Sequence, residues 1–215
     1  IYNLHFKFVL QRRFVPTRRL KTHQHAGCRL GCGHKRESVE HWGSCPTLDG
    51  IRSKLTALTQ EPRFKNPLTF LLGETPVGLL DRGAANFWLI LWHSLMLHLI
   101  KITADGAVPD LSNVWKLSIR QFADLTLALA YKAERSLQRN LAKGLEPRAE
   151  FPVQNKLLAP LASLDAEAGV IWSPSFRTEL TNLDLPGYIA SSHDGPPRRV
   201  KLEPIKFVKG PLHPK

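Results

Sequence analysis

Apolar residues recur at helical spacing along the middle of the chain and predict two long helices. The first follows Asp81, which can cap a helix start, and covers about 82–102. The second begins after Asp110 or Ser112 and continues until Gly144 ends it. The two helices are expected to pack as an antiparallel hairpin. The predicted contacts place Trp88, Trp92, Leu95 and Leu99 of the first helix against Leu117, Leu125 and Leu129 of the second.

The segments on either side have weaker patterns. Before the hairpin, Pro46 suits the first turn of a helix that continues to Thr59. Prolines and glycines punctuate residues 60–80, which predicts a loop with at most one short helix. After the hairpin, one more short helix is expected despite Pro160, and the prolines from Pro186 onward predict a mobile tail. The apolar residues of the two shorter helices are Ile51, Leu55 and Leu58, and then Leu157, Leu158, Leu161 and Leu164.

The apolar stretch at 84–100 approaches the roughly 20 residues that cross a membrane. Asn86, His93, Ser94 and His98 interrupt it, and each would be costly in hydrocarbon. We therefore expect a helix buried in the protein core and no membrane partner. The N-terminus does not resemble a secretory signal, and because it is Ile1 rather than Met we expect a fragment or a processed product.

Positive charge is concentrated near the N-terminus. The chain has a net charge of +12, and residues 1–54 hold eleven lysines and arginines against three acidic residues, a net charge of +8. A basic block at one end is typical of proteins that bind a polyanion such as nucleic acid. The alternative is a solvated surface with no such partner. Further along, the basic residues Lys132, Arg135, Arg139 and Lys143 crowd the last turns of the second long helix, where they suit the helix dipole.

All three cysteines lie between positions 28 and 45, in the pattern Cys28-x3-Cys32-x8-His41-x3-Cys45. An odd count argues against a disulfide framework, and the nearby histidines favour a metal site in a reducing compartment. Two close pairs of thiolate and imidazole ligands suit a tetrahedral Zn²⁺ with no open position, so the site should be structural. The rival ligands for His41 are His23, His25 and His34, and the alternative is three ordinary cysteines among surface histidines.

The residues around this cluster carry a longer motif. Cys28-Arg29-Leu30-Gly31-Cys32-Gly33 is followed by Glu37-Ser38-Val39-Glu40-His41 and Cys45-Pro46, and preceded by Phe14-Val15-Pro16-Thr17-Arg18-Arg19-Leu20. Over about residues 10–58, this resembles the zinc-binding domain that follows the polymerase in non-LTR retrotransposon reverse transcriptases. Many members have two residues between the first cysteines and four between the histidine and the last cysteine. Here both gaps hold three.

The resemblance implies a nucleic-acid-binding C-terminal portion of an RNA-directed DNA polymerase. Its partners would be template RNA or target DNA and an upstream polymerase domain, and its location intracellular, nuclear for an active element. The Tyr/Phe-x-Asp-Asp signature of the polymerase is absent from the sequence, so we expect no polymerase active site in this chain. The expected nucleic-acid contacts are Arg12, Arg13, Arg18, Arg19, Lys21, Arg29, Lys35 and Arg36.

Two other functions compete with this interpretation. Zinc could staple the N-terminal segment onto a helical protein-interaction domain with no nucleic-acid role. A hydrolase built from His93, His98, Asp105 and Asp110 matches no defensible catalytic pattern.

Trp42 or Phe14 could stack on an unpaired base, or either could be a packing residue.

The predicted fold is mainly α, with a small CCHC zinc knuckle followed by a helical hairpin and a disordered, proline-rich tail. The expected divisions are a basic lead-in and zinc knuckle at 1–58, a linker at 59–80, a helical region at 81–185 and a flexible tail at 186–215.

Overall fold

The computed structural model describes residues 27–28, 30–35, 39–73, 81–102, 110–144, 151–165 and 168–190. Within these residues the protein is mainly helical, with a two-stranded sheet, and the Cys/His cluster precedes the long helices. This confirms the predicted fold class for the described part of the chain. The prediction of a disordered tail falls outside it beyond residue 190, as do the predicted nucleic-acid contacts Arg12, Arg13, Arg18, Arg19, Lys21, Arg29 and Arg36.

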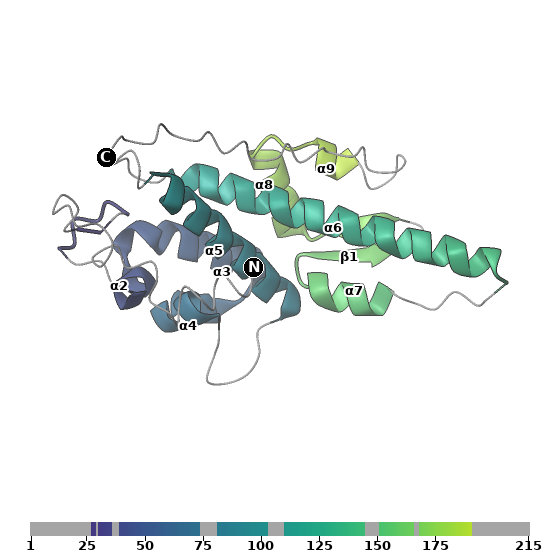
Figure 1. The fold of residues 1–215 in the computed structure, drawn as a ribbon, viewed down its shortest axis with the longest axis horizontal. Helices are drawn as coiled ribbons and strands as arrows, with labels where there is room; N and C mark the ends of the chain where they lie inside the picture. The colour runs from purple at the N-terminus through teal and green to yellow at the C-terminus, as the bar shows by residue number, and fades with distance from the viewer. Residues whose placement is uncertain are drawn as a thin grey trace, which may run out of the picture.

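The two predicted long helices are present and form the centre of the molecule (Figure 1). They are α5 (Arg82–Ile102) and α6 (Leu111–Ala142). They run antiparallel, since the ring of Phe87 near the start of α5 contacts that of Phe122 at a centroid distance of 5.7 Å, whereas His98 near its end bonds the backbone of Asp110. The Asp110 side chain caps α6 by accepting hydrogen bonds from the amides of Ser112 and Asn113.

The face that α6 buries differs from the predicted leucine stripe. Leu117 and Leu125 are 37% and 38% exposed, while the aromatic residues Trp115 and Phe122 are buried. The rest of the buried face includes Val114, Ser118, Ile119, Ala123, Thr126 and Ala133. The spacing of leucines did not predict this face because it also contains polar residues. Their hydroxyls form hydrogen bonds within the helix and can therefore be buried. The hydroxyls of Ser118 and Thr126 donate to the carbonyls four residues earlier, at 2.7 and 2.9 Å.

The core role predicted for the apolar stretch at 84–100 is confirmed. Large side chains of α5 such as Phe87, Trp88, Trp92 and Leu95 are buried among the other elements. In the described part of the chain, no helix combines the length and the apolar character needed to cross a membrane.

The segment between the knuckle and the hairpin is packed, which the proline and glycine pattern did not predict. After η2 (Pro46–Leu48) and α3 (Asp49–Thr59), which confirm the helix predicted to begin at Pro46, come η3 (Pro62–Lys65) and α4 (Pro67–Leu72). Phe64, Phe70 and Leu71 of these two helices are buried. Here the prolines lie in the first turns of helices and do not interrupt them. Residues 60–73 therefore belong to the core and not to a linker.

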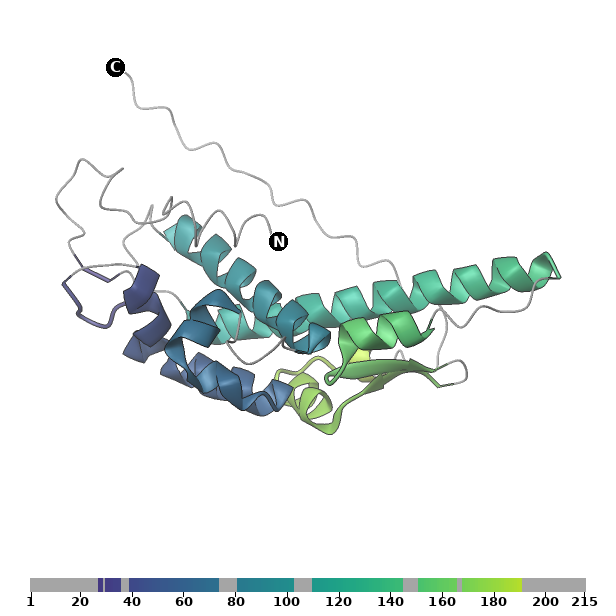
Figure 2. The same cartoon turned by 90° about the horizontal axis from the view of Figure 1, so that it is seen from below.

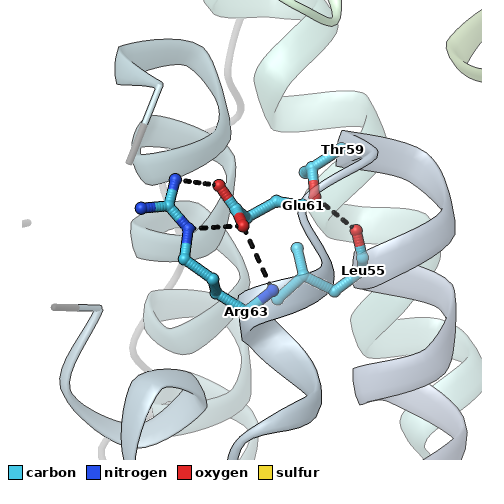
Figure 3. Close-up of polar contacts among 4 residues, drawn as sticks. All are labelled: Leu55, Thr59, Glu61 and Arg63. Carbon is cyan, nitrogen blue, oxygen red and sulfur yellow. Dashed lines mark hydrogen bonds and ion pairs between the residues drawn. The ribbon is translucent and has the colours of Figure 1, made fainter. Parts of the chain in front are cut away.

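A small polar cluster shapes the turn from α3 into η3 (Figure 3). Glu61 is only 7% exposed, and its carboxylate accepts hydrogen bonds from the backbone amide of Arg63 at 3.1 Å and from its Nε at 2.6 Å. The Arg63 side chain also pairs with the second carboxylate oxygen and lowers the pKa of Glu61. The hydroxyl of Thr59 donates to the carbonyl of Leu55 at 2.7 Å. A buried acidic residue is thus fully paired within its own turn.

Two indoles fasten α4 to α5. The Nε1 atoms of Trp88 and Trp92 both donate to the carbonyl oxygen of Phe70, at 2.6 and 2.9 Å. That carbonyl lies in the last turn of α4, where helix geometry leaves carbonyls without an intrahelical donor. Gly73 ends α4 with a φ of +67°, and the six-membered ring of Trp88 occupies the space that a Cβ there would need. The end of α4 is therefore fixed by side chains of α5.

The short helix predicted after α6 is present but ends at Leu158, and a β-hairpin follows it where the helix was expected to continue through Leu161 and Leu164. The elements are α7 (Phe151–Leu158), β1 (Ala162–Asp165), β2 (Gly169–Trp172), α8 (Pro174–Asn182) and α9 (Gly187–Ala190). The strands are antiparallel, with Ala162 opposite Trp172 and Asp165 opposite Gly169. Leu164 lies opposite Val170 of β2, and on its other side the Asn155 side chain bonds both its amide and its carbonyl, at 2.6 and 3.1 Å. The spacing of leucines in the sequence does not report these backbone contacts.

The start of the predicted flexible tail is also structured. The carbonyl of Tyr188 in α9 accepts a hydrogen bond from Trp172 Nε1 at 2.9 Å, and its hydroxyl donates to Asp124 of α6 at 2.7 Å. Nearby, Phe176 of α8 contacts the rings of Phe87 and Trp172. The C-terminal elements therefore complete the core of the α5–α6 hairpin.

A substitution at Gly83 tests how α7 docks on α5. A Cβ at Gly83 would clash with the backbone carbonyls of Leu158 and Ala159, while Gly50 in α3 has open space around it. We expect Gly83→Ala to lower the free energy of unfolding by about 1–3 kcal/mol, or more if the backbone cannot shift. Gly50→Ala, the matched control, should raise it by roughly 0.5–1 kcal/mol because alanine favours the helix. Urea denaturation measures both, and equal effects would contradict the close contact.

Candidate metal centre

The structure brings the four predicted ligands together. One ligand atom from each of Cys28, Cys32, His41 and Cys45 lies within 4.8 Å of all the others. The Sγ atoms of Cys28 and Cys45 are 3.9 Å apart, and Cys32 Sγ is 3.2 Å from His41 Nε2. A tetrahedron with zinc–sulfur bonds of about 2.3 Å has sulfur–sulfur edges of about 3.8 Å. The spacing of the ligand atoms is thus close to what a tetrahedral ion requires.

A tight backbone loop positions the first two ligands. The amide of Cys28 donates to the carbonyl of His34 at 2.9 Å, and the amide of Gly31 donates to the carbonyl of Cys28 at 3.0 Å. Gly31 and Gly33 both have a φ of +77°, a conformation that side chains with a Cβ rarely adopt. The glycines let the chain curl so that both thiols point to one centre.

The other two ligands come from a short helix and its exit. His41 is on α2 (Val39–Ser44), and Cys45 follows directly. Cys45 also precedes the first turn of η2, where its carbonyl accepts from the amide of Leu48 at 2.9 Å. The start of η2 therefore fixes the backbone of this ligand.

The centre is attached to the protein core through Trp42, the residue next to His41. Its side chain is 2% exposed and stacks on Trp92 of α5 with ring centroids 6.5 Å apart and planes 6° from parallel. Of the two roles predicted for Trp42, packing is confirmed and stacking on an unpaired base is excluded, because its ring is covered by the core. Phe14 lies outside the described residues. In the sequence, the position of a large apolar residue between the ligands His41 and Cys45 could have predicted this anchoring role.

Burial changes the protonation chemistry of the ligands. It raises the pKa of the Cys28 thiol to about 12 and also raises the pKa of Cys45. Burial also acts to raise the pKa of Cys32, but hydrogen bonds from the His34 backbone and the neighbouring thiols lower it overall. Burial and the nearby His34 lower the pKa of His41, which keeps its imidazole neutral near pH 7, as a metal ligand must be. A cation would stabilise the thiolates, so its binding would release protons.

The rival ligand His34 has a different position. Its ring stacks on that of His41 with centroids 4.2 Å apart, and its side chain is exposed outside the group of four. His23 and His25 lie outside the described residues. Among the residues that the structure describes, His41 completes the cluster.

The remaining candidates that lie in the described part of the chain do not form a second site. Lys35 is exposed on the loop between Cys32 and α2. Of the proposed hydrolase residues, His98 accepts a hydrogen bond from the Asp110 amide at 3.1 Å, and the Asp110 carboxylate caps α6. His93 is half-buried, its pKa lowered by burial, and Asp105 lies outside the described part. The first two have structural roles at the junction of α5 and α6.

The cluster can hold a metal ion, and its four side chains would complete a tetrahedral shell with no place for a reacting water. A metal ion held by all four ligands would therefore act as a structural staple. Similarity to known proteins adds nothing further: no family model, no curated protein and no solved structure matches the chain.

Proposed function

We propose that this chain is a zinc-stabilised nucleic-acid-binding module, the C-terminal portion of a retroelement reverse transcriptase that grips template RNA or target DNA. The observation that carries the proposal is the convergence of Cys28, Cys32, His41 and Cys45 within 4.8 Å. Three thiolates and an imidazole in tetrahedral spacing favour zinc over the oxygen-seeking ions magnesium and calcium.

Charge near the zinc ligands supports a polyanionic partner. Residues 1–54 have a net charge of +8, and in the sequence Arg29 follows Cys28 directly while Lys35 and Arg36 lie between Cys32 and His41. Of these residues the structure describes Lys35, which is exposed on the ligand loop, and the buried ring of Trp42 fixes the knuckle to the core. A basic side chain held in place loses less conformational entropy on meeting a phosphate than one on a flexible chain.

The retroelement assignment rests on the sequence motif. The Cys-x3-Cys pair, the segment Glu37–His41 and the pair Cys45-Pro46 occur in the order found in the zinc domain of those reverse transcriptases. The proposed contribution of the chain is to hold nucleic acid for an upstream polymerase domain.

A salt titration tests nucleic-acid binding. We expect the zinc-loaded full chain to bind a labelled oligonucleotide, with an affinity whose logarithm falls linearly with the logarithm of salt concentration. Engagement of roughly three to five phosphates gives a slope of about −2 to −5. Replacing Arg12, Arg13, Arg18 and Arg19 with glutamine should flatten this slope and weaken binding to all sequences alike. Fluorescence anisotropy provides the measurement.

The matched control removes the same amount of charge from the body of the protein. It carries glutamine at the exposed positions Lys65, Arg82, Lys116 and Arg177. We expect this variant to keep a slope within about one unit of the wild type, because each phosphate contact contributes about 0.9. If the two variants are indistinguishable, the N-terminal arginines do not form the grip.

The alternative function is a zinc-stapled domain that binds another protein. The observation in its favour is the exposure of Leu117 and Leu125 on α6, two large apolar side chains on one side of the helix. No oligonucleotide binding even at low salt would support this alternative over the nucleic-acid role.

A further inference from the structure

The last turns of α6 carry a row of basic side chains on one face. Lys132, Arg135, Arg139 and Lys143 are spaced by three, four and four residues, which places them on the same side of a helix. All four are exposed. In Figures 1 and 2 this end of α6 extends beyond α7 and the β-hairpin, so the row lies on a projecting helix. We call these four residues the α6 basic row.

Among the described residues, no acidic neighbour pairs with the row. Glu134 is the one acidic residue between positions 127 and 144, and its carboxylate accepts a hydrogen bond from Gln138 at 3.2 Å. The guanidinium of Arg135 lies 5.6 Å from the ring centroid of Tyr131. Within the described part of the chain, no carboxylate forms an ion pair with any of the four. The row is therefore available to an external anion.

The helix dipole does not account for the whole row. Favourable interaction with the dipole is confined to about the last turn of a helix. Helix α6 ends at Ala142, so Arg139 and Lys143 are within reach of that effect. Lys132 and Arg135 lie ten and seven residues before the end, beyond it. The dipole interpretation thus explains two of the four charges.

The chemistry of the row matches a phosphate backbone better than a protein groove or a membrane. From Lys132 to Lys143 the row covers about 16 Å along a rigid helix. Guanidinium groups donate two parallel hydrogen bonds to phosphate. The leucines of this segment, Leu137 and Leu141, are each two residues from Arg139 and so lie about 200° around the helix from it. A peptide or membrane partner would need a broad apolar surface beside the charges, whereas the exposed large apolar side chain next to the row is Tyr131, whose ring lies 5.6 Å from the Arg135 guanidinium.

We propose that the α6 basic row is a second nucleic-acid contact, which binds the phosphates of the same polyanion as the N-terminal basic segment. The inference rests on the proposed function. Helix α2 of the knuckle and the projecting end of α6 lie at opposite ends of the long axis of the molecule (Figure 1). A nucleic acid that meets both would run along the body of the protein, and α6, whose 32 residues extend about 48 Å, would support it.

A variant of three residues tests the row in the zinc-loaded full chain. Lys132→Gln, Arg135→Gln and Arg139→Gln together remove three phosphate contacts while keeping good helix formers. With a labelled 20-base-pair DNA duplex, we expect the slope of log affinity against log salt to flatten by about 2–3. The control variant, Lys65→Gln, Arg82→Gln and Arg177→Gln, replaces the same residue types at exposed positions elsewhere and should flatten it by less than about one.

Photocrosslinking provides a second measurement that does not depend on charge removal. A photoreactive residue in place of Ala128, exposed one turn before Lys132 on the same face, should crosslink to the duplex. The same residue in place of the exposed Ser53 on α3 should not.

The outcomes separate this inference from the function on which it rests. Wild-type binding with equal slopes for the two triple variants, and no crosslink from position 128, would overturn the α6 row and leave the N-terminal grip standing. A flattened slope for the row variant, with no effect of the four N-terminal arginines, would support the row and remove the N-terminal grip. Absence of wild-type binding would overturn both. Competition by a polyglutamate peptide as strong as that by unlabelled duplex would overturn the assignment to nucleic acid.

Discussion

Replacement of His41 by alanine should abolish stoichiometric zinc binding, whereas replacement of His34 should not. The two rings stack 4.2 Å apart, but only His41 places a nitrogen within the group of four ligand atoms. Loss of residues that merely support a ligand costs ten- to a hundredfold in metal affinity, so loss of the ligand itself should exceed about a hundredfold. Elemental analysis of purified protein should give one zinc per wild-type chain and per His34→Ala chain.

Loss of zinc should also lower the stability of the protein. Structural zinc sites contribute about 10–16 kcal/mol of apparent binding free energy in small zinc-dependent folds near pH 7. We expect a chelator to lower the unfolding midpoint of the wild type and of His34→Ala, and to leave His41→Ala unchanged. A native protein with three freely titratable thiols and no metal would contradict the site. Zinc retained by His41→Ala but lost by His34→Ala would reassign the fourth ligand.

Replacement of Trp92 by alanine should cost about 3–5 kcal/mol of unfolding free energy, the range for truncation of a buried Trp or Phe. Trp92 is fully buried, stacks on Trp42, tilts against Phe70 and donates to the Phe70 carbonyl. Truncation therefore leaves a cavity at the point where α2, α4 and α5 meet. Urea denaturation monitored by circular dichroism would measure the loss.

Two controls define what the Trp92 result means. Trp92→Phe keeps an aromatic ring, and Trp88 still donates to the same carbonyl, so its cost should be clearly smaller. Ile171→Ala removes a side chain that is 47% exposed on β2 and should change the free energy of unfolding by less than about 1 kcal/mol. A cost for Trp92→Ala no larger than that of Ile171→Ala would show that the junction of the three helices is not as tightly packed as described.

The features that local chemistry determines could be predicted from the sequence. Asp110 caps α6 and Gly144 follows its end, so both boundaries of that helix follow from single residues. The ligand cluster was predictable because thiols and an imidazole at close spacing have few other uses. In each case the signal lies within a few residues of the structure it specifies.

The features that depend on distant partners could not be predicted. Leu164 is in a strand that pairs with β2 and whose other side is bonded by Asn155, and the periodicity of apolar residues reports neither contact. Phe70 is buried because two tryptophans on α5 reach the end of α4. The buried face of α6 was missed because Ser118 and Thr126 satisfy their own hydroxyls and can enter the core. A tertiary contact overrides local preference at Phe70, whereas the bonds of Ser118 and Thr126 lie within α6 and allow polar residues on its buried face.

The stacking of Trp42 on Trp92 has a consequence for how such a knuckle can be inherited or transplanted. A boundary at residue 58 would pass through shared packing, since Trp42 precedes it and its receptor Trp92 follows. The carbonyl of Leu58 itself accepts a hydrogen bond from Ser175 at 3.2 Å. The Cys/His knuckle is therefore not a unit that can be separated from α5 and α8 without loss of packing. A chimera that grafts residues 1–58 onto another protein would expose the indole of Trp42, and recombination that preserves the knuckle must carry its helical receptor with it.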